Sequence, residues 1–444
     1  MYKRDIINFL FIISFPIYGI GNYISAVKSP SAGYLISISP HLLILLFYFI
    51  DLLYTREFKI RLNVYYFLML LFLLSSIVSL FIALGKGLPE SNLLLTVTKA
   101  TLLIVPFHSF LMVVLYNEKK GNFLKLTLLG LTLLLVVNWV GYFGMGLSNE
   151  VHSIEGRLNF PFLDGFYSGA NLLAIIDLLI LYYLQRSWNY PIRFVSLSAF
   201  FVTNLAMFFL INSRLSILVF FLVLGLCLFG IIRAKGLFLL SLFTIPILLG
   251  SGVLMYKVLQ LPGLSSVLQR VNVEDVTTFN GRAFLWRDAL DWLFNDQRGL
   301  VWGNGYKGHY FLDLISDVAK MWNEKEIHHM HLHSSTLEIL VCQGLVFFVV
   351  FVILFYHIYQ YFKRKHSTGQ ADGAFFPVVV FLLFIMQVDT FVYLDSLGFV
   401  IFSLLAARIA ISDRVYVDGM REEGRVEKSA RSGAMQEVSL TALN

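Results

Sequence analysis

The chain has 444 residues, of which 58% are hydrophobic and only 14% are charged, and its mean hydropathy is +0.74. A soluble domain is about one-quarter charged, so this composition excludes an ordinary soluble enzyme. The net charge of +6 does not indicate a nucleic-acid partner, because the cations lie in short loops between apolar runs.

Apolar runs recur along the chain, and each is long enough to cross a hydrocarbon core of about 30 Å. We predict an all-α polytopic membrane protein with about twelve transmembrane helices. The last two adjoin so closely that eleven would also fit. In chain order, the predicted spans are 6–26, 32–53, 64–85, 92–116, 123–146, 168–185, 193–212, 215–232, 237–256, 335–362, 374–393 and 395–411.

Lysine and arginine concentrate in one set of alternate loops, whereas the opposite set holds only Lys28, Lys86, Arg157 and Arg214. Short cytoplasmic loops carry this excess of cations in membrane proteins. The pattern predicts a cytoplasmic N-terminus and a cytoplasmic C-terminal tail, 412–444. The tail lacks an apolar pattern, and we expect it to be disordered.

The segment 257–334 is far longer than any other loop, and the same pattern places it on the far side of the membrane. It is too apolar for a disordered loop, so we interpret it as a small, mostly helical cap. The cap would separate two transmembrane regions, 1–256 with the first nine spans and 335–411 with the last three. A helical pattern covers 282–293, and a second helix is predicted over 311–322. The residues expected near one side of the first are Phe284, Leu285, Ala289, Leu290 and Leu293.

Arg214 stands between two apolar runs, in Asn212-Ser213-Arg214. An arginine at a membrane boundary is costly unless it reaches water or pairs with an anion. An ordinary interfacial arginine is the alternative interpretation. Because cations are otherwise scarce on this side of the membrane, a functional role for Arg214 is favoured.

Arg282 follows a glycine in Asn280-Gly281-Arg282 and precedes Trp286. The glycine permits a tight turn before the helix. Arginine is unfavourable at the positive end of a helix unless an anion binds there too. The alternative is a surface arginine on a soluble cap.

Four histidines occur within 328–333, and the last of them, His333, precedes a predicted helix. Ser335-x-x-Glu338 matches a capping box and marks the N-terminus of that helix. The positive helix end should lower the pKa of His333 and keep the ring neutral, as a general base requires. There are two alternatives to a general base. The histidines could form a divalent metal site, or they could be solvated residues of a loop.

Two further patterns are interpreted as structural. The segment 303–308 matches G-x-G-x-x-G, but no βαβ unit surrounds it, so its glycines more plausibly form a turn. Cys227 and Cys342 both lie in apolar runs and predict neither a disulfide framework nor a cysteine-based metal site.

Two arginines and a histidine at one membrane face suit a particular reaction. Arginine pairs well with phosphate oxygens, and two arginines can balance a diphosphate leaving group without a metal. A neutral histidine beside them could deprotonate an acceptor hydroxyl. We expect Arg214, Arg282 and His333 to surround one cavity, with a lipid-borne diphosphate as donor.

These motifs resemble the O-antigen ligase/polymerase superfamily of bacterial inner-membrane glycosyltransferases. The strongest match is His333-Ser334 followed, after nine residues, by Gly344, with Leu337-Glu338 between them. The other matching segments are Gly281-Arg282 with Trp286, Gly303-Asn304-Gly305, Asn212-Ser213-Arg214, and Arg157 with Asn171-Leu172-Leu173-Ala174.

The resemblance implies a C-type glycosyltransferase-like bundle and a metal-independent reaction without a cofactor. Arg214 and Arg282 would hold the diphosphate of an undecaprenyl-diphosphate-linked glycan, and His333 would activate the acceptor hydroxyl. The supporting residues would be Ser334, Glu338, Gly281, Trp286 and Arg157. The active site would face the periplasm, with both termini cytoplasmic. The acceptor, which could be another glycan, lipid A-core or a protein hydroxyl, stays open.

The main alternative is a secondary transporter or a flippase for lipid-linked glycans, because about twelve spans suit that class equally well. Such a protein needs ionisable residues within the bilayer, and the candidates are Lys99, Asp177 and Asp389. Asp177, in the middle of a span, is the strongest of these. Its alternative interpretation is a buried polar contact between helices.

Overall fold

The protein is an all-α, multi-pass membrane protein, as the sequence predicts. Its structure, a computed structural model, describes residues 3–55, 62–117, 122–147, 158–163, 165–249 and 281–411. Within these ranges, nine helices are long and apolar enough to cross a membrane, and two apolar helices are shorter. The single β contact in the described part is an isolated bridge between Leu62 and Ile411.

The apolar helices follow the predicted spans closely. They are α1 (Lys3–Val27), α2 (Pro30–Thr55), α3 (Val64–Gly85), α4 (Leu93–Asn117), α5 (Phe123–Trp139), α6 (Gly165–Arg186), α7 (Pro191–Ile211), α8 (Arg214–Leu228), α16 (Ser335–Ser367), α17 (Phe375–Val388) and α18 (Leu397–Ala410). The span predicted over 237–256 differs, because α9 (Leu237–Leu242) ends inside it. Part of that span, and the tail 412–444, lie outside the described residues.

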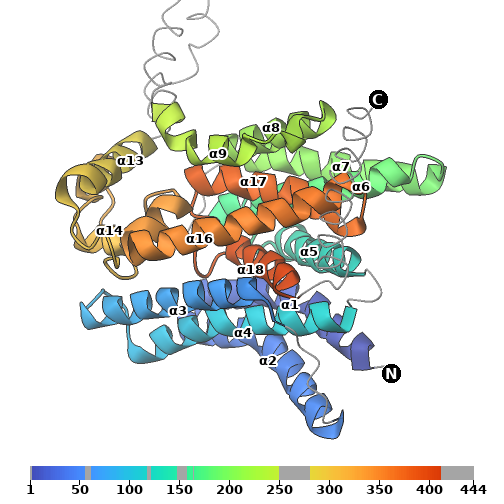
Figure 1. The fold of residues 1–444 in the computed structure, drawn as a ribbon, viewed down its shortest axis with the longest axis horizontal. Helices are drawn as coiled ribbons and strands as arrows, with labels where there is room; N and C mark the ends of the chain where they lie inside the picture. The colour runs from blue at the N-terminus through green and yellow to red at the C-terminus, as the bar shows by residue number, and fades with distance from the viewer. Residues whose placement is uncertain are drawn as a thin grey trace, which may run out of the picture.

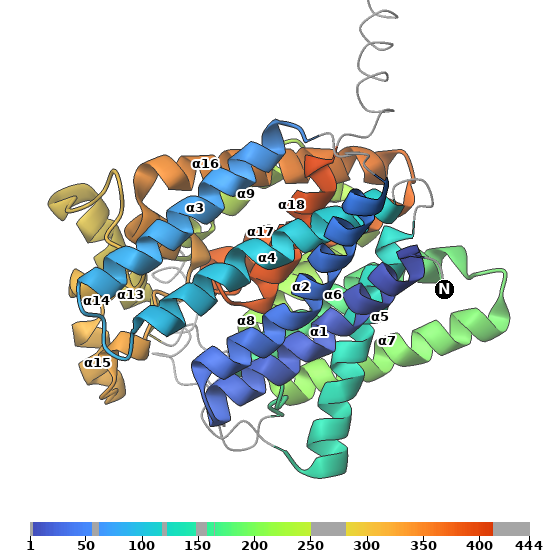
Figure 2. The ribbon, with the colours of Figure 1, turned by 90° about the horizontal axis from the view of Figure 1, so that it is seen from below.

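The long helices lie side by side, with α16 packed against α3 and α17, and α18 packed against α4 (Figures 1 and 2). The short helices α13 (Arg282–Asp291) and α14 (Gly308–Phe311) lie at one end of the bundle, which we call the loop end. Helix α1 begins at the opposite end, the terminal end.

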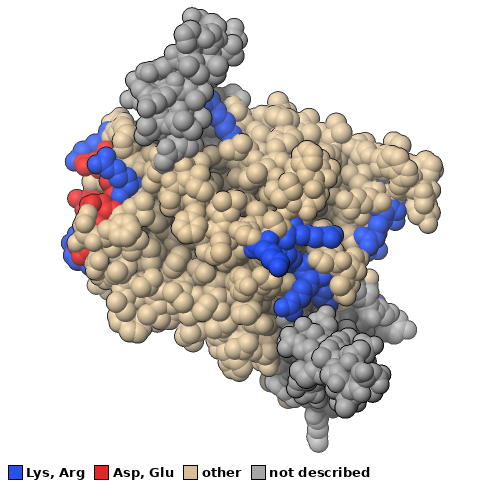
Figure 3. All heavy atoms as spheres, turned by 45° about the horizontal axis from the view of Figure 1, so that its top comes forward, with Lys and Arg blue, Asp and Glu red and all other residues tan. Residues whose placement is uncertain are grey.

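Burial separates the centre of the bundle from its periphery. In the most apolar stretch of each helix, 94% of the residues are buried in α17, but only 17% in α7. Large apolar side chains such as Phe49 and Leu53 on α2 are exposed, as lipid-facing positions should be. The acidic side chains visible in Figure 3 gather with basic ones at the loop end, on the left of the view.

Helix α16 is broken at Gly344, whose backbone is non-helical with φ of +83°. The segment 303–305 packs into this break: the N–H groups of Asn304 and Gly305 donate to the carbonyls of Val341 and Cys342, both over 3.0 Å. A Cβ on Gly344 would lie 2.4 Å from the nitrogen of Gly303. Two glycine motifs therefore meet here, and carbonyls freed by the break find partners within the protein.

The described part of the long loop is folded, although its helices differ in detail from the prediction. Helix α13 continues into a π-helical turn, η5 (Trp292–Asp296). Its buried side consists of Arg282, Leu285, Trp286 and Ala289, whereas Phe284, which the sequence pattern grouped with Leu285 and Ala289, is exposed.

The helix predicted over 311–322 is interrupted. Helix α14 ends at Phe311, and α15 (Ser316–Trp322) begins five residues later. Between them, Asp313 has a left-handed backbone with φ of +59°, which a continuous α-helix cannot accommodate. The last turn of the loop, η6 (Ile327–His329), leads directly to His333.

Candidate functional site

The N-terminus of α16 organises the loop end around His333. Ser334, not Ser335, is the N-cap: its side chain accepts a hydrogen bond from the N–H of Leu337 over 3.3 Å. The predicted capping box was therefore wrong by one residue at its first position, although His333 does lie just outside the helix. Ser335 instead donates from its N–H and its hydroxyl to the carbonyl of Asp389, which ties α16 to the end of α17.

Glu338 does not reach back to the cap, as a capping box requires. It is buried, and it accepts a hydrogen bond from the N–H of Leu332 over 2.7 Å. Its other oxygen lies 2.9 Å from Nδ1 of the buried His309, whose Nε2 lies 3.0 Å from the carbonyl oxygen of Met330. Glu338 and His309 thus hold the backbone immediately before His333.

Arg282 is the first residue of α13 and is only 3% exposed. One Nη donates to the carbonyl of Val388 at the end of α17 over 2.6 Å, and the guanidinium lies 4.9 Å from the centre of the Tyr167 ring. Within the described ranges, no carboxylate pairs with it. A buried guanidinium without an anionic partner is unfavourable, so this position suits an anionic ligand.

Gly281 and Trp286 attach α13 to the histidine loop. Gly281 has φ of +80°, and a Cβ there would lie 2.9 Å from the indole of Trp322. That indole lies edge-on to His333, with ring centres 6.0 Å apart. Trp286 is fully buried, and its Nε1–H donates to the carbonyl of Leu332 over 3.1 Å. Each part of the Gly281-Arg282…Trp286 motif therefore has a structural role beside His333.

His333 has a left-handed backbone, with φ of +49°, and packs against His331 with ring centres 4.3 Å apart. Its Nδ1 is buried and has no hydrogen-bond partner within the described part of the protein. Burial, followed by the positive fields of His331, Arg282 and Lys307, holds the pKa of His333 well below its usual range. The predicted direction is correct, but burial and neighbouring cations cause it.

The structure brings together six of the predicted residues: Arg282, His333 and, around them, Gly281, Trp286, Ser334 and Glu338. Arg214 is the exposed first residue of α8, and no hydrogen bond or ion pair within the described ranges joins it to the others. Its place in the site stays a prediction. Arg157 lies outside the described residues.

Two residues that the sequence analysis did not single out also belong to this region. Lys307 donates to the carbonyls of His329 over 3.0 Å and of Met330 over 2.8 Å, and burial lowers the pKa of this lysine. Trp322 lies between Gly281 and His333. Their patterns in the sequence do not indicate this role, because each acts through chain segments that meet only in the fold.

The residues that a transporter would use have structural partners. Asp177 is 1% exposed and accepts a hydrogen bond from Asn204 of α7 over 2.8 Å, which is the polar contact between helices anticipated as the alternative. Lys99 of α4 forms an ion pair with Asp395 over 3.4 Å. Asp389 caps the end of α17.

Comparison with known families gives one match. The family model described as O-antigen ligase matches residues 199–352, a range that contains Arg214, Arg282 and His333. The resemblance to the O-antigen ligase/polymerase superfamily, predicted from the motifs, is thereby confirmed. A comparison with curated proteins gives no match.

Proposed function

We propose that this protein, with the O-antigen ligase family match over residues 199–352, transfers a glycan from a lipid-linked diphosphate to an acceptor hydroxyl. The observation that carries the proposal is that the buried Arg282 lies near enough to His333 to lower the pKa of its ring. One is a buried cation without a carboxylate partner in the described ranges, and the other is a neutral imidazole with an unpartnered Nδ1.

The donor is proposed to be an undecaprenyl-diphosphate-linked glycan. Its lipid would lie in the bilayer beside the bundle. Its diphosphate would lie at the loop end, next to Arg282. The guanidinium can form paired hydrogen bonds to phosphate oxygens. Arg214, at the exposed start of α8, would supply the second cation once the donor is bound.

In the proposed reaction, the imidazole of His333 takes the proton of the acceptor hydroxyl. The oxygen then attacks C1 of the donor sugar, and the bond between C1 and the diphosphate oxygen breaks. The diphosphate leaves with the bonding electrons, and the two arginines balance its charge. Because His333 is neutral near pH 7, it can act as this base without prior deprotonation.

The reaction is proposed to take place on the periplasmic face of the bacterial inner membrane, with arginines in place of a catalytic metal. This sidedness is supported by the excess of Lys and Arg in one set of alternate loops along the sequence. Among acceptors, we favour a glycan or lipid A-core over a protein hydroxyl.

The direct test is transfer by the purified chain in proteoliposomes supplied with lipid-linked donor and candidate acceptors. Wild-type protein should form product, and Arg282→Ala and His333→Ala should not, at equal reconstituted amounts. The acceptor that gains the glycan distinguishes a polymerase from a ligase. If the donor instead crosses the bilayer unchanged, and equally well with both variants, the protein is a flippase and the proposal is wrong.

A further inference from the structure

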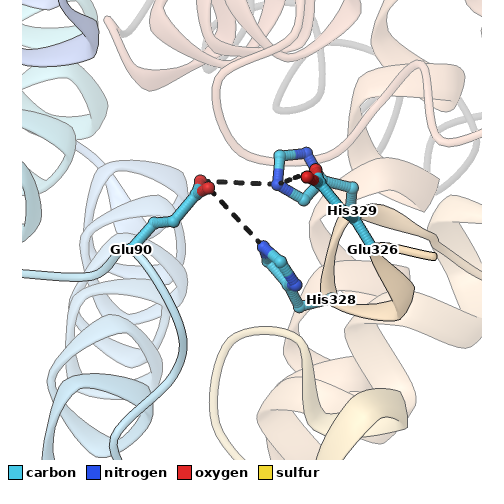
Figure 4. A group of neighbouring side chains, drawn as sticks. All are labelled: Glu90, Glu326, His328 and His329. Atoms are coloured by element: carbon cyan, nitrogen blue, oxygen red, sulfur yellow. Dashed lines mark ion pairs between the residues drawn. The ribbon is translucent and has the colours of Figure 1, made fainter.

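Four side chains of types that can bind a metal meet at the loop end, and Arg282 and His333 are not among them. Glu90 comes from the loop between α3 and α4, and Glu326, His328 and His329 come from η6 and the residue before it. Figure 4 shows the two carboxylates and the two imidazoles directed toward one another. One ligand atom from each residue lies within 4.8 Å of every other.

Two of the nitrogen–oxygen separations match those around a common tetrahedral ion, and a third, from His328, is longer. His328 Nε2 lies 3.8 Å from one oxygen of Glu90, and His329 Nε2 lies 3.4 Å from the other oxygen and 3.3 Å from Glu326. Charge-assisted hydrogen bonds are shorter, about 2.7–2.9 Å. Ligands held at about 2.0–2.1 Å from a tetrahedral Zn²⁺ ion lie about 3.3–3.4 Å apart.

The burial of His328 is a second, independent indication of a ligand. Its side chain is 19% exposed, but its Nε2 is buried and has no hydrogen-bond partner in the described part of the protein. That nitrogen faces Glu90. A buried ring nitrogen without a hydrogen bond is costly, and a metal ion would remove this cost.

We propose that Glu90, Glu326, His328 and His329 bind a divalent transition-metal ion, with Zn²⁺ the ion that fits best. Two carboxylates and two neutral imidazoles carry a charge that a divalent cation balances. Mixed nitrogen and oxygen ligands favour Zn²⁺, whereas Mg²⁺ and Ca²⁺ prefer oxygen alone. The other two histidines of the segment, His331 and His333, are not in this group.

The role that follows from the position of this site is to clamp two segments together. The ion would join the loop between α3 and α4 to η6, four residues before His333. Lys307 already holds the same turn through the carbonyls of His329 and Met330. Beneath the group lies a cavity of about 200 Å³, whose lining includes Lys99, Tyr306 and Lys307. The ion would close the mouth of this cavity and restrain the histidine loop, without contact with the reacting groups.

The test uses the full chain in nanodiscs, purified without a polyhistidine tag, stripped with a chelator and titrated with ZnCl₂. Zinc content is measured by mass spectrometry after dialysis, and affinity by calorimetry. The wild type should retain one Zn²⁺ per chain, and Glu90→Gln and His328→Asn should each bind it at least about tenfold more weakly. Asp317→Asn, an exposed acid on α15, and His331→Asn, a histidine of the same loop, should bind as the wild type does.

A wild-type chain that retains no zinc would overturn the proposal, as would equal binding by all four variants. Two further readouts do not depend on the folding of any variant. Co²⁺ bound to the wild type should give the intense visible absorption of a tetrahedral site, and an octahedral spectrum would contradict the ligand set. Zn²⁺ should slow amide hydrogen exchange over 324–333, and unchanged exchange would exclude the clamp.

Discussion

The indole Nε1–H of Trp286 donates to the carbonyl of Leu332 over 3.1 Å, and so connects α13 directly to the backbone that precedes His333. Glu338 accepts from the N–H of the same Leu332. The position of His333 is therefore fixed from two directions, by the motif that carries Arg282 and by the first turns of α16.

Trp286→Phe keeps the ring in its buried site but removes the donor. The carbonyl of Leu332 is left unpaired, which costs about 1–3 kcal/mol. Because His333 would shift, we expect kcat to fall about 10- to 100-fold, with the KM for the lipid-linked donor near that of wild type. Steady-state kinetics in proteoliposomes separate the two constants. A change confined to KM would mean that Trp286 acts on the donor and does not position His333.

Arg282→Ala removes the buried cation that is proposed to hold the diphosphate. Transfer should fall by about 10²- to 10³-fold, the typical effect of removing one charge-stabilising donor. Arg287→Ala is the matched control, because Arg287 lies on the same helix but is exposed. It should behave as wild type. Equal losses in the two variants would show that general charge on α13, and not a specific contact, supports transfer.

The depressed pKa of His333 predicts the pH profile of transfer. The ring stays neutral at pH values where an ordinary histidine, with a pKa of about 6.5, would be protonated. The kcat/KM of transfer should therefore stay constant well below pH 6.5 and decline only as the pH falls through the lowered pKa. His333→Asn should lose about 10²- to 10⁴-fold in rate and show no such acid limb. A midpoint at or above pH 6.5 would contradict the assignment.

Gly344→Ala should destabilise the protein, because the alanine must adopt φ of +83° and its Cβ would lie 2.4 Å from the nitrogen of Gly303. The backbone strain alone costs roughly 1–3 kcal/mol. Thermal unfolding in detergent measures the effect. Gly225→Ala on α8 is the control, since a Cβ there meets nothing within 4 Å, and it should unfold at or above the wild-type temperature. Equal unfolding temperatures for the two variants would argue against the break in α16.

Asp177→Asn distinguishes a structural carboxyl from a transport residue. The amide oxygen can still accept the hydrogen bond from Asn204, so transfer and protein abundance should match wild type. The variant is assayed for transfer beside Arg282→Ala in the same vesicles. Loss of activity in Asp177→Asn with retention in Arg282→Ala would favour the transporter interpretation.

The sequence predicted the helices of the bundle well, because a run of about 20 apolar residues has few other stable structures. It did not predict the break at Gly344, because a single glycine inside a predicted span does not by itself indicate a break in the helix. It also placed a continuous span over 237–256, where the structure ends α9 at Leu242. The break in α16 depends on its packing against 303–305, a segment of the long loop, whereas the break after α9 is a single turn residue, Phe243, after which helical backbone resumes.

For the candidate site, short patterns pointed to Arg282 and His333, because polar and charged residues are rare in this chain and those that occur are easily noticed. The patterns could not show that Arg282 is buried, since its cover comes from Tyr167 and the end of α17. The histidine cluster raised the possibility of a metal. Two of its histidines, His328 and His329, belong to the group proposed to bind a metal, and Glu90, more than 200 residues away, was not recognisable from the sequence as their neighbour.

The break in α16 also bears on how the protein is inserted into the membrane. The stretch after Gly344 has 18 residues, 345–362, before the basic run that starts at Lys363. It extends about 27 Å at 1.5 Å per residue, which is close to the thickness of the hydrocarbon core. Insertion therefore does not require the preceding segment, Ser335–Gln343, which contains Glu338 and Gln343. We expect the apolar half to be delivered to the bilayer first, and the polar half to assemble only after α3 and the loop are in place. The proposed site around His333 would then form late, after the surrounding helices have been inserted into the membrane.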